Sequence, residues 1–137
     1  DRLYRKYAGV MEGTGKEIGI HAHNNMQLGF ANTIEAIVLG SNRADATMAG
    51  LGRGAGNCPM ELLLGFLRNP KFKLRPVIRL LQDHIPGIRE TVEWGPLVPY
   101  NITGQLNLHP RAAIKFRAGN DKEDFVAFYD QIVNEKE

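Results

Sequence analysis

Only two segments of this 137-residue chain have the pattern of a β-strand, and a helix pattern follows each of them. They are residues 17–23 and residues 43–49. Strands that alternate with helices indicate a parallel sheet covered by helices. Two strands cannot complete such a sheet, and a (β/α)8 barrel needs about 250 residues. We therefore expect an α/β fold in which this chain is the C-terminal portion of a barrel, about its last two βα units.

Helix patterns surround both strands. The sequence predicts helices over residues 1–12, over residues 24–39 with Gly40 as the C-cap glycine, and from Pro59 to residue 67. The chain begins without an initiator methionine and already at helical spacing, so we expect earlier sequence to precede it. The barrel part should occupy residues 1–69.

The pattern becomes mainly helical from residue 70 onwards. The sequence predicts a helix over residues 74–84 that breaks at Pro86, an irregular excursion over residues 88–109, a short helix over residues 110–117, and a last helix that begins with a capping box of Asn120 and Glu123. We expect residues 70–137 to form a mainly helical C-terminal extension.

Charge and composition exclude several classes of partner. The 17 basic and 15 acidic residues are well mixed, so no basic stripe predicts nucleic-acid binding. The single cysteine, Cys58, excludes an internal disulfide framework, and the apolar runs are shorter than the roughly 20 residues of a membrane span. No signal-peptide pattern is present. We expect a cytoplasmic protein.

The strongest chemical feature is the pair His21 and His23 at the end of the first predicted strand. Residues i and i+2 of a strand point to the same side, so both imidazoles can converge on one ion. A hydrogen-bonded structural pair is the alternative. The position of the pair at the end of a strand favours metal binding, because parallel α/β folds place their functional sites at the C-terminal ends of strands.

Asparagines stand next to this pair and at the end of a later glycine-rich run. One of Asn24 and Asn25 is expected to cap the following helix, and the other could hold a histidine ring or a substrate oxygen. Asn57 could cap the helix begun by Pro59 or give an oxygen to a hard metal ion.

The glycine-rich run itself, residues 50–56, offers backbone N–H groups to an anionic substrate group, with Gly52 and Gly54 as the candidate contacts. A tight connection without a ligand is the alternative. Asp45 lies in the second predicted strand, must be paired or hydrogen-bonded if buried, and could support the site from beneath. Cys58 is expected to be a packing residue rather than a nucleophile.

Residues 19–64 resemble the C-terminal barrel segment of the hydroxymethylglutaryl-CoA lyase-like family of metal-dependent aldolases and lyases. His-x-His-Asn, a long helix containing Ala-Asn, an Asp-Ala strand and a Gly-x-Gly-x-Gly-Asn loop follow one another in the family's order. Within that family, the segment is most similar to the 4-hydroxy-2-oxovalerate aldolase branch.

The resemblance implies a set of roles. His21 and His23 would be ligands of Mn²⁺ or Mg²⁺, with Zn²⁺ used by some relatives, and Asn57 ranks as a third ligand. Tyr100, in the region after the barrel, would be a catalytic tyrosine. The family's remaining ligand, an aspartate on the first barrel strand beside an arginine, is not in this chain, so the chain alone should be inactive.

The implied reaction is reversible carbon–carbon cleavage of a 2-oxo acid of the 4-hydroxy-2-oxo type, through an enolate that the metal stabilises. Acyl-CoA condensing enzymes of the isopropylmalate or homocitrate synthase type share much of the pattern and are the alternative. A non-catalytic metal- or anion-binding module, and an interaction domain over residues 88–137, also remain open. The expected partner is a small 2-oxo acid, and a homo-oligomer is compatible with the sequence.

Overall fold

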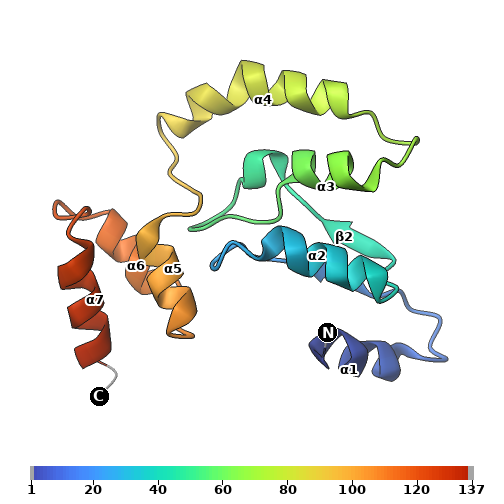
Figure 1. The fold of residues 1–137 in the computed structure, drawn as a ribbon, viewed down its shortest axis with the longest axis horizontal. Helices are drawn as coiled ribbons and strands as arrows, with labels where there is room; N and C mark the ends of the chain where they lie inside the picture. The colour runs from blue at the N-terminus through green and yellow to red at the C-terminus, as the bar shows by residue number, and fades with distance from the viewer. Residues whose placement is uncertain (1, 136–137) are drawn as a thin grey trace.

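The structure, a computed structural model, describes residues 2–135. Its elements, in chain order, are α1 (Arg2–Met11), β1 (Gly19–His21), α2 (Gly29–Val38), β2 (Arg43–Asp45), the 3-10 turn η1 (Met48–Gly50), α3 (Met60–Leu67), α4 (Leu74–Arg89), α5 (Val98–Gln105), α6 (Arg111–Arg117) and α7 (Phe125–Asn134) (Figure 1). Asp1 and the last two residues of the expected extension lie outside the described residues. No helix among the described residues is both long and apolar enough to cross a membrane.

The two strands form a parallel pair joined by the crossover helix α2, as the alternating pattern predicts. In the register of the pair, Ile20 lies beside Ala44 and His21 beside Asp45. Each strand has one neighbour in the described chain, so each has an unpaired edge. The α/β class with a small parallel sheet is therefore confirmed.

The strands and the first crossover helix are shorter than expected. β2 ends at Asp45, and residues 48 and 49 of the expected strand belong to the turn η1 instead. The helix predicted from residue 24 begins at Gly29, and Asn24 accepts a hydrogen bond from the Gly29 backbone N–H through its Oδ1 atom at 3.0 Å. The N-cap residue is Leu28, so the expectation that Asn24 or Asn25 is the N-cap is wrong, although Asn24 does bind the first backbone N–H of the helix.

Pro86 does not break the helix that contains it. α4 runs on to Arg89, with Pro86 on the exposed side and Ile85 buried beside it. A proline removes one backbone hydrogen bond. In α4 this hydrogen bond would lie in the last turns, on the solvent-exposed side of the helix. Water can satisfy the backbone carbonyl there, so the helix continues.

The expected irregular excursion contains a helix, α5. Pro99 stands in its first turn, which is a helix-start signal. The buried residues Pro99, Tyr100 and Thr103 lie on one face of α5. However, Thr103 is polar and the apolar Val98 is 46% exposed, so the apolar residues show no clear amphipathic period and the pattern did not reveal the helix.

The expected capping box of the last helix is wrong. The N-cap of α7 is Asp124, whose side chain accepts a hydrogen bond from the Ala127 backbone N–H at 3.1 Å. Glu123 is unavailable for a capping box with Asn120, because its Oε1 atom accepts from the Arg117 guanidinium at 2.8 Å.

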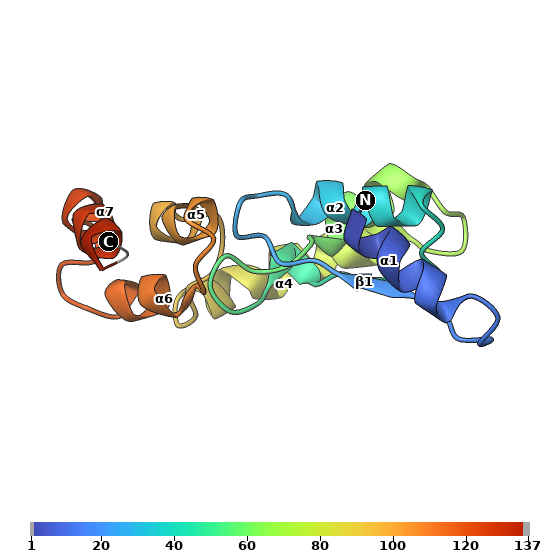
Figure 2. The ribbon, with the colours of Figure 1, turned by 90° about the horizontal axis from the view of Figure 1, so that it is seen from below.

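The three C-terminal helices have a core of their own. It contains Tyr100, Ala113, Phe128 and Ile132, and it also takes in Ala55 from the glycine-rich run. Figure 2 shows the α5–α7 cluster beside the part of the chain that holds α1–α4, along the long axis of the molecule. The extension therefore packs on the glycine-rich run, and α4 packs on α3.

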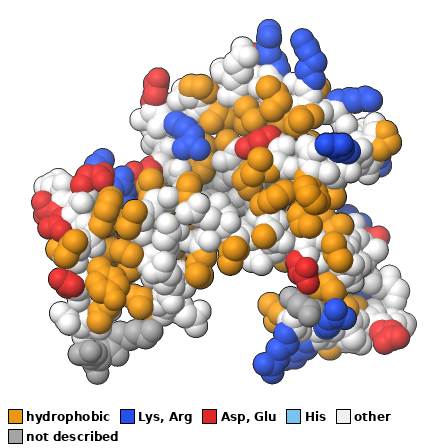
Figure 3. Space-filling view, viewed as in Figure 1, with side chains coloured by type: hydrophobic (Ala, Val, Ile, Leu, Met, Phe, Trp, Pro, Cys, Tyr) orange, Lys and Arg blue, Asp and Glu red, His pale blue; other side chains and the backbone are white. Residues whose placement is uncertain are grey.

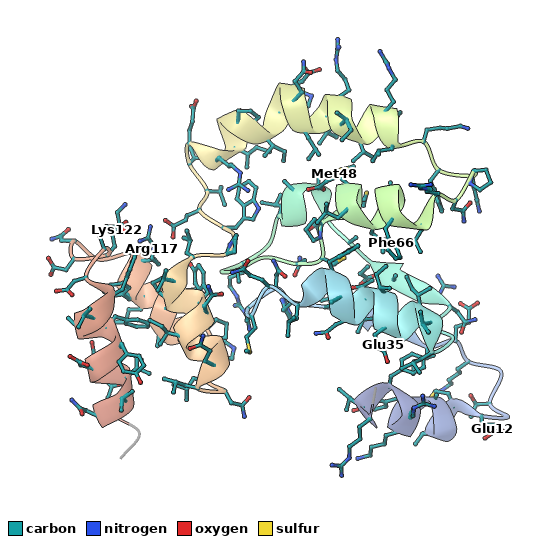
Figure 4. All side chains as sticks on the ribbon, in the orientation of Figure 1. Glu12, Glu35, Met48, Phe66, Arg117 and Lys122 are labelled. Atoms are coloured by element: carbon teal, nitrogen blue, oxygen red, sulfur yellow. The ribbon has the colours of Figure 1, made fainter. Side chains whose placement is uncertain are left out.

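Arg117 ties the segment before α5 to the end of α6. Its guanidinium, only 10% exposed, donates to both carboxylate oxygens of Glu93, at 3.0 and 2.6 Å, and to the Lys122 backbone oxygen at 2.6 Å. Figure 4 shows Arg117 and Lys122 together at the α6–α7 connection. The hydrogen bonds from Arg117 hold the pKa of Glu93 below its usual value, against a smaller opposing effect of burial.

The lowered pKa of Glu93 makes the stability of the extension sensitive to acid. Ionised Glu93 should stabilise the fold above the ordinary glutamate pKa, about 4.3, and this contribution should be lost as the pH falls through the lowered value. We expect Glu93→Gln to be less stable than the wild type at neutral pH, by less than about 1 kcal/mol because the carboxylate is partly exposed. Urea unfolding at several pH values measures the difference, which should vanish in acid. The exposed neighbour substitution Glu90→Gln is the control, and a difference that persists in acid would contradict the assignment.

Candidate functional site

His21 and His23 lie on one side of the chain at the end of β1. Both are exposed, while Ala22 between them is 7% exposed and points away from that side. Their ring centroids are 5.1 Å apart, with the ring planes at 76°. The predicted convergence of the two imidazoles is therefore confirmed.

Asp45 reaches His21 from the neighbouring strand. The parallel register sets the two residues side by side, and the His21 Nδ1 atom lies 3.1 Å from a carboxylate oxygen of Asp45. Asp45 is exposed on the same open side as the histidines rather than buried beneath them. A carboxylate on one ring nitrogen orients a histidine and leaves the other nitrogen, Nε2, for a metal ion.

The segment of residues 50–57, called the glycine loop below, returns to the end of β1. Asn57 and His23 form an antiparallel bridge, closed by hydrogen bonds from Asn24 N to Gly56 O at 2.9 Å and from Cys58 N to Ala22 O at 3.1 Å. The backbone thus sets Asn57 directly beside the second histidine.

The Asn57 side chain does not cap α3. Its Nδ2 atom donates to the Leu51 carbonyl at 3.2 Å, and the N-cap of α3 is Pro59, without a side-chain hydrogen bond. This hydrogen bond from the nitrogen fixes the orientation of the side-chain amide. The hydrogen bond of the side chain uses its nitrogen and not its Oδ1 atom, so that oxygen stays a candidate ligand for a hard metal ion.

At two glycines of the loop a Cβ atom would lie too close to a neighbouring group, which is backbone for Gly56 and a side chain for Gly52. A Cβ atom on Gly56, whose φ is +80°, would lie 2.2 Å from the Gly50 carbonyl oxygen, and one on Gly52 would lie 2.6 Å from the Asn57 amide nitrogen. The interpretation of the glycine-rich run as a tight connection therefore has direct structural support. Substrate contact through Gly52 and Gly54 stays a prediction.

Tyr100 and Asn25 come to the same region from different elements. Tyr100 is 3% exposed, and its ring lies against Gly54 in the glycine loop. Burial raises the pKa of Tyr100, with a further contribution from the charge of Glu93 that Arg117 opposes. The backbone of Asn25 lies against Gly104, so α5 contacts both the loop after β1 and the glycine loop.

The hollows of the surface do not coincide with the histidine pair. One of them, about 640 Å³, is a mainly apolar gap between α1 and α2, and only His23 of the pair lines it. Another, about 470 Å³, lies between Gly52, Gly54 and Tyr100 on one side and Arg117 and Lys122 on the other. Among the described residues no group of three or more histidine, cysteine or acidic side chains could hold a metal ion. His21, His23 and Asn57 therefore remain candidate ligands, and other residues would have to complete a metal site.

Sequence reasoning missed the residues that hold the glycine loop. Glu61 accepts a hydrogen bond from the Ala49 backbone N–H at 3.0 Å, and Trp94 donates to the Ala49 carbonyl at 2.9 Å. Nothing in the pattern links a tryptophan of the expected irregular stretch to a turn 45 positions earlier.

Known proteins are similar to this part of the chain. The model of the family described as HMGL-like matches residues 4–82. A 4-hydroxy-2-oxovalerate aldolase of Dechloromonas aromatica (strain RCB) is 58% identical over 48 residues, which are 35% of this chain and 14% of that aldolase. One of Acidovorax sp. (strain JS42) is 55% identical over 51 residues, or 37% of this chain and 15% of that aldolase. The chain thus matches a small part of these relatives.

A solved structure extends the likeness to the fold. The crystal structure of the N-terminal domain of a candidate aldolase from Bacteroides vulgatus superposes with a TM-score of 0.61 and 32% identity, over 81% of this chain and 38% of that one. The likeness covers most of the described fold, including part of the extension.

Proposed function

The chain belongs to the HMGL-like family, and on that basis we propose that it carries three of the metal ligands of a divalent-metal-dependent aldolase or lyase. The observation that carries the proposal is the pairing of His21 with Asp45, beside His23 and Asn57, at the open end of a parallel strand pair. Ligand histidines almost always give their other ring nitrogen to such a partner.

The proposed place of this chain is the last two βα units of a barrel, completed by strands that are not in it. Each strand has an unpaired edge, and large apolar side chains remain on the surface, among them Val38 at 75%, Leu62 at 52% and Phe66 at 60% exposure. Figure 3 shows apolar side chains over α2, α3 and α4. Further barrel strands and helices would cover such surfaces.

In the proposed reaction, His21, His23 and Asn57 would hold Mn²⁺ or Mg²⁺, and the ion would polarise the carbonyl of a 2-oxo acid. Asp45 orients His21. Tyr100, whose pKa burial raises further above neutral pH, is the proposed proton donor. Asn25 and the backbone of Gly52 and Gly54 are the proposed substrate contacts. An aspartate and an arginine outside this chain would complete the site, so the chain alone is proposed to be inactive.

The substrate class follows from the relatives named above. We propose a 4-hydroxy-2-oxo acid, cleaved between the carbon that bears the hydroxyl group and the carbon next to the 2-oxo group. The test is aldol cleavage by a polypeptide that contains this chain together with the missing barrel strands, with and without added Mn²⁺. Cleavage that does not depend on a divalent ion would contradict the proposal.

Asp45 offers a test of the metal site within this chain. Co²⁺ is a useful probe, because imidazole sites bind it more tightly than Mn²⁺ and its spectrum reports the ligands. We expect Asp45→Asn to weaken Co²⁺ binding by about 10- to 100-fold, the range for loss of a histidine's carboxylate partner. Spectroscopic titration measures this. The control is Asp83→Asn, which removes an exposed carboxylate paired with Arg79 on α4, and equal affinities in the two variants would refute the role of Asp45.

A further inference from the structure

Trp94 connects the C-terminal extension to the beginning of the glycine loop. The side chain is 2% exposed, and its Nε1–H donates to the Ala49 carbonyl at 2.9 Å. The next residue, Gly95, donates its backbone N–H to the Gly54 carbonyl at 3.1 Å. The segment before α5 therefore holds the loop at two points.

Arg89, at the end of α4, holds Trp94 in turn. Its guanidinium lies 4.1 Å from the centre of the indole ring, and its Nη1 atom donates to the Trp94 carbonyl at 3.2 Å. A cation over the face of tryptophan is a favourable contact. The indole is thus held by Arg89 over its ring and by the Ala49 carbonyl at its N–H, and Gly56 lies close to its edge.

The turn that Trp94 contacts has a conformation that needs support. Ala49 has a φ of +53°, in the left-handed region that residues with a Cβ atom rarely adopt. Its N–H donates to Glu61 and its carbonyl accepts from Trp94, so both of its backbone groups are held by side chains. Such conformations persist where the surroundings determine them. Figure 4 shows Met48, the first residue of this turn, close to α3 and α4.

The turn is linked directly to the candidate metal ligand. The Gly50 carbonyl accepts the Asn57 backbone N–H at 3.0 Å, and the Leu51 carbonyl accepts the Asn57 side-chain amide at 3.2 Å. A shift of η1 would therefore move both hydrogen bonds that orient Asn57 beside His23.

We propose that Trp94 is a positioning residue: through Ala49 it holds the glycine loop in the conformation that sets Asn57 beside His23. The role of Asn57 as a ligand rests on the proposed function, whereas the effect on the loop does not. The helical extension, which supplies none of the proposed metal ligands, then contributes to the metal site through the loop's backbone.

Trp94→Phe tests this contact in the full 137-residue chain. Phenylalanine keeps an aromatic ring under Arg89 but loses the N–H donor to Ala49, together with the five-membered ring of the indole. We expect backbone amides of residues 50–57 to exchange with deuterium about tenfold faster, the factor that one hydrogen bond corresponds to, and Co²⁺ affinity to fall by a similar factor. Ile132→Val, in the core of the extension away from the loop, should change neither. Arg89→Met should act in the same direction as Trp94→Phe and provides a second variant if the first does not fold.

The two readouts separate this inference from the proposed function. Unchanged exchange in residues 50–57 would overturn the inference, as would faster exchange with unchanged Co²⁺ affinity. If the unsubstituted chain does not bind Co²⁺ at all, the proposed metal site fails, and faster exchange confined to residues 50–57 would still support the hold of Trp94 on the loop.

Discussion

Substituting His23 with alanine, in a polypeptide that contains this chain and the missing barrel strands, is expected to abolish metal binding and aldol cleavage together. His23 is one of the proposed ligands and has the Asn57 backbone bridged to it. Removing a ligand removes the ion, and Lewis-acid stabilisation of several kcal/mol corresponds to a fall of at least about 100-fold in kcat/KM. Metal content by mass spectrometry and cleavage of a 4-hydroxy-2-oxo acid measure the two effects.

Two other histidines provide matched controls. His84 on α4 and His109 before α6 are both exposed and lie on elements outside the candidate site. His84→Ala and His109→Ala should keep metal content and turnover near the wild type. Unchanged turnover in His23→Ala would sink the metal assignment, whereas an equal loss in all three variants would point to a general effect on folding.

Replacing Gly56 with alanine is expected to cause a large loss of stability. The new Cβ atom would lie 2.2 Å from the Gly50 carbonyl oxygen, on a residue whose φ is +80°. A left-handed conformation costs about 1–2 kcal/mol for a residue with a Cβ atom, and overpacking adds about 1–3 kcal/mol. We therefore expect the free energy of unfolding to fall by about 2–5 kcal/mol. Urea unfolding followed by the fluorescence of Trp94, the single tryptophan, measures it.

The control for Gly56→Ala is the same change at an open helical position. Gly9 lies inside α1, and a Cβ atom there would meet nothing within 4 Å. Gly9→Ala should leave the stability unchanged or raise it by up to about 1 kcal/mol, because alanine is the better helix former. Equal stability of the two variants would mean that the glycine loop does not have the close approach between Gly50 and Gly56.

The convergence of His21 and His23 could be predicted because it depends only on the two-residue period of a strand. The contact with Asp45 could not, since it depends on which residue of β2 lies beside His21. A register shifted by one residue would have placed Ala44 or Ala46 beside His21. The sequence suggested a supporting acid, and the strand pairing determined which histidine it supports.

Residues 70–137 were harder to predict than residues 1–69. The buried face of α5 includes the polar Thr103, while the apolar Val98 is exposed, so apolar residues do not mark that face. The proline signal at Pro86 was outweighed by the packing of Ile85 in the same helix. The capping box failed because Arg117, six residues before Glu123, engages that carboxylate. Each error comes from side-chain contacts that local patterns do not contain.

The bond between Trp94 and Ala49 has a consequence for the order in which this protein can fold. The two residues are 45 positions apart, and the loop that carries Asn57 lies between them in the sequence. During synthesis the histidines, Asp45 and Asn57 all leave the ribosome before Trp94 does. Since domains begin to fold from the N-terminus as they are made, the strand pair can form early, whereas the loop can reach its final conformation only after α4 has been translated. Completion of the proposed metal site is therefore expected only after Trp94 has been translated.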